Sequence, residues 1–91
     1  MNGKPGEPAM NQKIFSMNLG VETVSLYLLC CAIADAGAAI TRANLLLKWN
    51  GNPSSLDREL GQLEKRHILG RADERKDGET VYTVLDEKQW F

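Results

Sequence analysis

The sequence predicts a mainly helical α+β fold in which three short helices are followed by a β-hairpin. Two observations lead to this prediction. Apolar residues recur at helical spacing over three segments, each bounded by residues that start or stop helices. Two extended runs within residues 69–85 then flank Asp77-Gly78, a dipeptide that favours a tight hairpin loop. The three helical segments are expected at residues 21–36, 41–49 and 53–67.

The first residues of the chain are expected to form a disordered leader over residues 1–12. This part is rich in proline and glycine and lacks the basic and apolar regions of a secretory signal. The remaining residues, 13–91, are enough for one small domain. At its start Phe15, Met17 and Leu19 alternate with polar residues, which predicts a short strand or an extended arm with one apolar edge.

The first helix should begin near Val21 and end before Gly37, which suits a left-handed stop. Its apolar residues form two stripes and leave no continuous polar face, so the helix has to be covered on two sides. The chain's two cysteines, Cys30 and Cys31, are adjacent inside this apolar helix. Two adjacent cysteines inside an apolar run are typical of reduced thiols in the core of a cytoplasmic protein and not of a disulfide framework.

The next two helices are separated by a short turn. Thr41 is a suitable N-cap for the second helix, and Asn52 followed by Pro53 is a suitable start for the third. Gly51 permits a positive φ in the turn between them. Two short helices joined by about four residues form a helix-turn-helix unit.

The third helix has distinct inner and outer sides. The inner side is predicted to carry Leu56, Leu60, Leu63 and His67. The outer side is centred on Ser54, Arg58, Gly61 and Lys65, with Gln62 beside them. The flanks hold Asp57 and Glu64 on one edge and Glu59 and Arg66 on the other. The outer side is therefore predicted to be positive and rich in hydrogen-bonding groups, although the helix as a whole is not basic.

The hairpin follows with a predicted register. A two-residue loop at Asp77-Gly78 would pair Lys76 with Glu79, Arg75 with Thr80 and Asp73 with Tyr82. Either Tyr82 and Val84 or Val81 and Leu85 would then face the core, and alternation alone does not decide between them. After the hairpin, Asp86 is a candidate cap for a last short turn that contains Trp90 and Phe91.

These features resemble a known family. The run Leu63-Glu64-Lys65-Arg66-His67-Ile68-Leu69-Gly70-Arg71, then Asp77-Gly78, then Val81-Tyr82-Thr83-Val84-Leu85, resembles the end of the recognition helix and the wing of winged helix-turn-helix domains. The resemblance covers residues 21–85. The compact order of the helices is similar to that of small MarR-type or DnaD-type modules. It implies duplex DNA binding by a small transcriptional regulator, with the third helix in the major groove and the wing on the flanking backbone. Many members have glycine where this chain has His67, so the resemblance implies a left-handed conformation there.

Nine residues are the expected DNA contacts. They are Asn52, Ser54, Ser55, Arg58, Gln62 and Lys65 on the third helix and Arg71, Arg75 and Lys76 in the wing. The opposing observation is the overall charge, since 11 basic and 12 acidic residues leave a net charge of −1 and no bulk positive field. The alternative is a winged-helix module that contacts another protein in a larger assembly.

The apolar surface exceeds what the three helices need for their own packing. The surplus residues either close one monomer, with both chain ends folded over the first helix, or form a two-fold dimer interface. The homodimer is the preferred prediction. Its interface would consist of Phe15, Met17, Leu19, Leu26, Leu29, Ile33, Trp90 and Phe91.

No sequence motif points to an enzyme. The chain has no glycine-rich phosphate loop, no nucleophile elbow and no metal-ligand spacing around its single histidine, so neither a catalytic site nor a metal or other cofactor is expected. The longest apolar run, residues 26–34, is far shorter than the roughly 20 residues that span a bilayer, so no membrane segment is expected.

Overall fold

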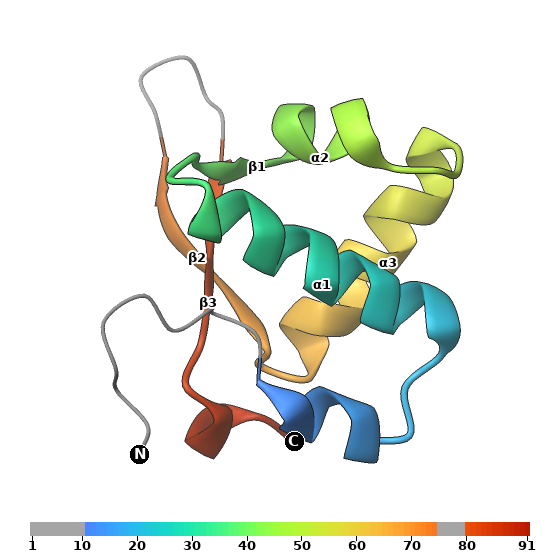
Figure 1. Cartoon of the computed structure of the whole chain (residues 1–91), viewed down its shortest axis with the longest axis vertical. Coiled ribbons are helices and arrows are strands. Elements are labelled where there is room, and N and C mark those ends of the chain that lie inside the picture. Colours follow the sequence, from blue (N-terminus) through green and yellow to red (C-terminus); the bar gives the residue numbers. More distant parts are fainter. Residues whose placement is uncertain (1–10, 75–79) are drawn as a thin grey trace.

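The computed structural model describes residues 11–74 and 80–91. Within them the chain is a mainly helical α+β protein, as predicted. Its helices are α1 (Val21–Asp35), α2 (Arg42–Lys48) and α3 (Pro53–Lys65), with the short 3-10 helices η1 (Gln12–Ser16) and η2 (Glu87–Gln89) near the ends. Its strands β1 (Ile40–Thr41), β2 (Leu69–Glu74) and β3 (Thr80–Val84) form an antiparallel sheet in the order β1-β3-β2 (Figure 1).

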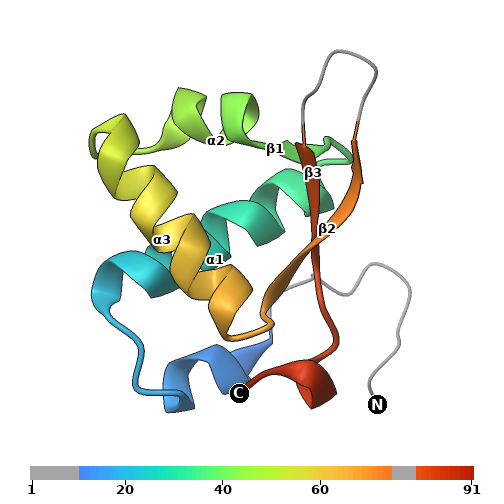
Figure 2. The same cartoon turned by 180° about the vertical axis from the view of Figure 1, so that it is seen from behind.

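This order of elements is compatible with the predicted layout of three helices and a hairpin. In both views α1 crosses the middle of the molecule, between α3 and the β2-β3 hairpin (Figures 1 and 2). None of the helices in the described ranges is apolar over a length that would cross a membrane.

The ends of α3 follow the predicted signals. The Asn52 side chain accepts a hydrogen bond from the Ser55 amide at 2.8 Å, and Pro53 is the first helical residue. At the other end His67 has a φ of 58°, which confirms the left-handed conformation expected at this residue. The helix stops at Lys65, earlier than expected, and the Arg66 amide donates to the Gln62 carbonyl.

The glycine in the turn before α3 has a different role from the predicted one. Among the described glycines only Gly37, after α1, has a positive φ, of 82°. A Cβ at Gly51 would lie 2.5 Å from the Ser55 hydroxyl and 2.9 Å from the indole nitrogen of Trp49. Glycine at position 51 therefore leaves room for the close approach of these two side chains, and the positive φ that it permits is not adopted.

Strand β1 was not predicted. Ile40 and Thr41 pair with Tyr82 and Val81 of β3, and the Thr41 hydroxyl also accepts a hydrogen bond from the Asn44 amide at 3.1 Å. Thr41 therefore caps α2, as expected, while its backbone extends the sheet. Two residues are too few to show the alternation by which a strand is recognised in sequence.

The register of the hairpin differs from the predicted one. Asp73 pairs with Val81 instead of Tyr82, and Thr80 pairs with Glu74 instead of Arg75. A bulge between Arg71 and Asp73 then shifts the ladder by one more residue, so that Tyr82 pairs with Arg71. Tyr82 and Val84 pack against the core, which decides between the two alternatives left open by the alternation. The predicted loop at Asp77-Gly78, with Lys76 and Glu79 beside it, lies outside the described residues.

The two ends of the described chain cover α1 on the side that faces away from α2. Ile14 of η1 is fully buried, and the Asn11 amide donates to the Tyr27 hydroxyl at 2.8 Å. Trp90 packs edge-on against Tyr27, with ring centroids 5.6 Å apart. Both segments lie side by side at the same end of the molecule (Figures 1 and 2). The double coverage predicted for the first helix is therefore supplied by the chain itself.

This closure corrects the predicted dimer interface. Leu26, Ile33 and Trp90 have exposed fractions of 0%, 6% and 7%, so they belong to the core of one chain. Met17, Leu19 and Leu29 are partly buried against the same core. Phe15 and Phe91 stay exposed, and a homodimer through them remains a prediction.

The start of the folded part also needs correction. Asn11 caps η1 through its side chain, which accepts from the Lys13 amide, so the folded part begins before the expected leader ends at residue 12. The expected extended arm is instead a 3-10 helix, in which Ile14 points inward and Phe15 outward. The alternation of apolar residues was misleading because the buried residue of the segment is Ile14, outside the alternating set. Residues 1–10 lie outside the described part.

The cysteines are buried in α1, in agreement with the expected core thiols. Cys30 is fully buried and Cys31 nearly so, and neither forms a disulfide. Burial raises the pKa of the Cys30 thiol to about 12 and also raises that of Cys31. Because the thiolate is the reactive form, burial makes both cysteines poor nucleophiles and poor redox sensors.

Candidate nucleic-acid interface

Helix α3 separates its inner and outer sides as the periodicity predicts. Leu56, Leu60 and Leu63 are buried, and α3 packs mainly against α1, in front of which it lies in Figure 2. The outer residues Ser54, Arg58, Gly61, Gln62 and Lys65 are all exposed. His67 was wrongly placed on the inner side, because the left-handed turn at that residue redirects its side chain to the surface, where the ring packs edge-on against Phe91.

Two of the predicted contact residues at the start of α3 already have structural hydrogen bonds. The Ser55 hydroxyl donates to the Asn52 carbonyl at 2.8 Å and accepts from the Trp49 indole at 2.9 Å. The Asn52 side-chain oxygen accepts from the Ser55 amide. The Ser55 hydroxyl is therefore occupied at the helix start, whereas Ser54 is exposed on the outer face; DNA contacts by either serine remain predictions.

Arg58 lies between two carboxylates. Its Nε donates to Glu59 at 3.1 Å and its Nη2 to Glu22, near the start of α1, at 3.2 Å. The hydrogen bond to Glu59 is the main reason why the pKa of Arg58 is raised, so this side chain stays cationic throughout the accessible pH range. Arg58 is 62% exposed, and its guanidinium is accessible from solvent at the edge of the outer face.

Glu59 is a buried charge that the sequence interpretation placed on an exposed flank. Its exposed fraction is 6%, and its Oε1 accepts a hydrogen bond from the Thr23 hydroxyl of α1. A signal for this burial exists in the sequence. Residues 56, 59, 60 and 63 have the spacing i, i+3, i+4, i+7 of a buried stripe, so Glu59 occupies a core-facing position between Leu56 and Leu63. The sequence interpretation missed this position because a charged residue is usually assigned to the exposed side of a helix.

Two further ion pairs connect α3 to its neighbours. Arg42, the first residue of α2, donates to Asp57 through Nε and Nη2 at 2.7 and 3.1 Å, and the hydrogen bond lowers the pKa of Asp57. Arg71 of β2 donates to Glu64 at 2.9 Å. The outer face is thus bordered by three arginines, each from a different element, and each with a carboxylate on α3 or α1 as its partner.

The remaining basic side chains of α3 and the wing differ in how far hydrogen bonds and ion pairs already occupy them. Arg66 donates to the carbonyls of Phe91 and Met17, so its side chain connects α3 to both ends of the described chain. Lys65 is exposed, and no ion pair connects it to another side chain in residues 11–72 and 80–91. Arg75 and Lys76, the other predicted wing contacts, lie outside the described residues. Lys65 is therefore the cation of α3 that is most available to a ligand.

Gly61 lies on the outer face with open space around it, since no atom comes within 4 Å of a Cβ built at this position. Replacing it with alanine is expected to increase the free energy of unfolding by about 0.5–1 kcal/mol, because glycine has the lower helix propensity. Urea denaturation of the two proteins measures the difference. A loss of stability would show that the helix requires glycine at this position.

Comparisons with known proteins found no match: no protein-family model, no curated protein and no solved structure is similar to this chain at a significant level. The chemistry of the residues must therefore indicate the function.

In residues 11–74 and 80–91, no group of three or more histidine, cysteine, aspartate or glutamate side chains is placed to hold a metal ion.

Proposed function

We propose that this chain is a winged-helix domain that binds duplex DNA, with α3 in the major groove and the β2-β3 hairpin against the flanking backbone. The single observation that supports this most is the character of the outer face of α3. The face is uncovered and polar, and the large exposed apolar residues Phe15, Val21, Leu47 and Phe91 all lie on other elements. A surface that offers hydrogen bonds and cations without an apolar centre suits base edges and phosphates better than a protein core.

The paired arginines fit the same proposal. Arg58, Arg42 and Arg71 are at least 44% exposed while each contacts a carboxylate. Ion pairs between exposed groups contribute only about 0–1 kcal/mol, so a phosphate can replace the carboxylate at little cost. A guanidinium binds either anion with the same planar set of N–H groups. The pairs therefore keep the arginines extended beside α3. Cations held next to this helix can contact phosphates although the net charge of the whole chain is −1.

The test is a fluorescence-anisotropy titration with a mixed-sequence DNA duplex at low and moderate salt. Lys65→Glu is expected to weaken binding about tenfold or more at low salt, because it removes a charge-assisted contact and adds a repulsive charge. The affinity of the unaltered protein should fall steeply as salt increases. Lys65 is preferable to Arg58 for charge reversal, since a glutamate at position 58 would lie beside the buried Glu59 and destabilise the fold.

Lys88→Glu is the matched control. Lys88 is exposed on η2, outside α3 and the hairpin, and its replacement changes the net charge by the same amount. Equal losses in the two variants would mean that overall charge, and not α3, controls binding. Salt-independent binding, or none at low salt, would contradict the proposal.

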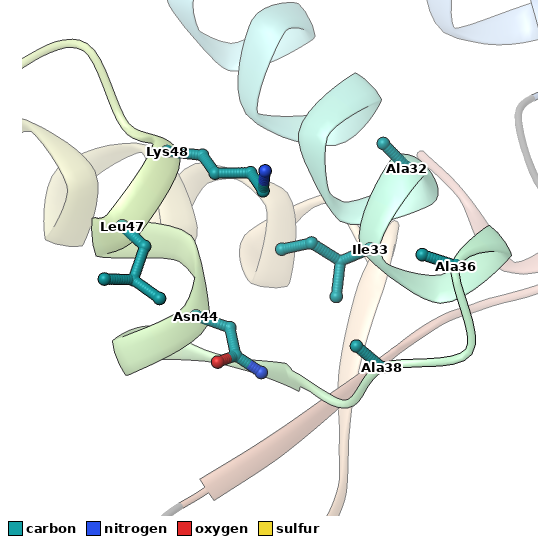
Figure 3. A pocket seen from close by; sticks show the side chains of 7 residues that line it. All are labelled: Ala32, Ile33, Ala36, Ala38, Asn44, Leu47 and Lys48. Atoms are coloured by element: carbon teal, nitrogen blue, oxygen red, sulfur yellow. The ribbon is translucent and has the colours of Figure 1, made fainter.

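A second candidate function is supported by a different surface. A groove of about 320 Å³ lies between the end of α1 and α2 and is lined mainly by apolar side chains. Ile33 points into it, Leu47 stands at its edge with 82% of its surface exposed, and Lys48 reaches across it toward α1 (Figure 3). An exposed leucine beside an apolar groove is typical of protein contacts. If the duplex does not bind, a winged-helix protein-interaction module becomes the better proposal.

A further inference from the structure

We propose that Glu22 limits the affinity of this domain for DNA by competing with the duplex for Arg58. This inference rests on the proposed function of α3. Glu22 lies in the first turn of α1, 36 residues before Arg58, and its carboxylate accepts a hydrogen bond from Arg58 Nη2 at 3.2 Å. It was not among the residues predicted to affect binding.

The geometry of the guanidinium explains the competition. A guanidinium binds a phosphate or a guanine edge through two parallel N–H groups, either Nε with Nη2 or Nη1 with Nη2. In Arg58 the Nε is used by Glu59 and the Nη2 by Glu22. Glu22 therefore places a second carboxylate at Nη2, so a phosphate or a guanine edge that approaches Nη2 meets its negative charge and competes with it for this nitrogen.

Only one of the two carboxylates can be displaced. Glu59 is 6% exposed and accepts a hydrogen bond from Thr23, so it keeps its position whether or not a ligand is present. Glu22 is 63% exposed and has no other hydrogen bond within the described residues. Release of Glu22 removes the competing carboxylate from Nη2, so that the Nη1 and Nη2 edge can bind a phosphate, while Glu59 continues to hold the Nε side in place. Glu22 therefore acts as a removable competitor, and Glu59 positions the arginine.

The decisive experiment combines Glu22→Gln and Arg58→Gln in a double-mutant cycle, with the same duplex titration. Glu22→Gln is expected to raise the affinity about two- to fivefold at low salt, the size expected when one exposed ion pair no longer has to be broken. In the Arg58→Gln background the same change should have a much smaller effect. Glu87→Gln on η2 is the matched control, because it removes the same charge from an exposed carboxylate outside α3 and can still accept the hydrogen bond from Asn11.

A second measurement observes the ion pair without DNA. Rotation of the Arg58 Nη groups, followed by NMR of the free protein, should be slower in the unaltered protein than in Glu22→Gln. Equal rotation would overturn the inference, as would binding of the duplex with equal affinity by both proteins or an equal gain from Glu87→Gln. Failure of every variant to bind the duplex would overturn the proposed function and the inference with it, whereas binding without a gain from Glu22→Gln would overturn the inference alone.

Discussion

Replacing Trp90 with alanine is expected to lower the free energy of unfolding by about 3–5 kcal/mol, a large part of the roughly 5–14 kcal/mol available to a domain of this size. Trp90 is 7% exposed, packs edge-on against Tyr27, and donates its indole N–H to the Leu85 carbonyl at 2.9 Å. Alanine would leave a cavity beside the fully buried Tyr27 and a carbonyl without its partner. The melting temperature should fall by more than about 12 °C.

This variant separates the two interpretations of the surplus apolar surface. If Trp90 belongs to the core of one chain, the loss of stability is the same at every protein concentration. If it belongs to a dimer interface, the loss depends on concentration, because association contributes to stability. Urea denaturation at two concentrations a hundredfold apart distinguishes the cases. Phe91→Ala is the matched control, since Phe91 is the adjacent aromatic residue and is 63% exposed, and its loss should be small.

Local signals in the sequence were sufficient for the helices and their ends. Asn52, Pro53 and His67 determine the limits of α3 through hydrogen bonds and backbone angles within a few residues, so one sequence contains the necessary information. The same holds for Asp86, whose side chain caps η2 by accepting from the Lys88 amide. Interactions this local do not depend on the rest of the fold.

The features that were missed depend on residues far apart in the chain. β1 exists because residues 40 and 41 meet β3, and the register of the hairpin is the result of pairing between β2 and β3 along their whole length, with a bulge between Arg71 and Asp73. Trp90 could be assigned to the core only once Tyr27 was known to lie beside it. Hydrophobicity showed that these surfaces had to be covered. It did not show whether the same chain or a second copy covers them.

The candidate site was predictable in position and less so in chemistry. Periodicity placed Ser54, Gln62 and Lys65 on the outer face of α3, where they are exposed. It could not show that Ser55 is used by Trp49, or that Arg58 is held by a residue of α1. Those partners come from other elements, and they determine which side chains remain available to a ligand.

The buried pair of Thr23 and Glu59 is expected to show strong energetic coupling. Thr23→Val should lower the free energy of unfolding by about 1.5–3 kcal/mol, because a nearly buried carboxylate loses a hydroxyl donor and no water can replace it fully. Glu59→Leu should cost less. The threonine hydroxyl left behind is neutral, and a neutral group without its partner costs less than a buried carboxylate without its donor.

The double variant Thr23→Val, Glu59→Leu should be more stable than the sum of the two single losses predicts, by about 1 kcal/mol or more. Both polar groups are then gone, and apolar side chains of similar size meet between α1 and α3. Arg58 loses one partner in this variant but remains largely exposed, so water compensates for that loss. Denaturant unfolding of the four proteins measures the coupling. Additive losses would mean that Glu59 is stabilised mainly by Arg58 at the surface, and that Thr23 contributes little to the position of α3.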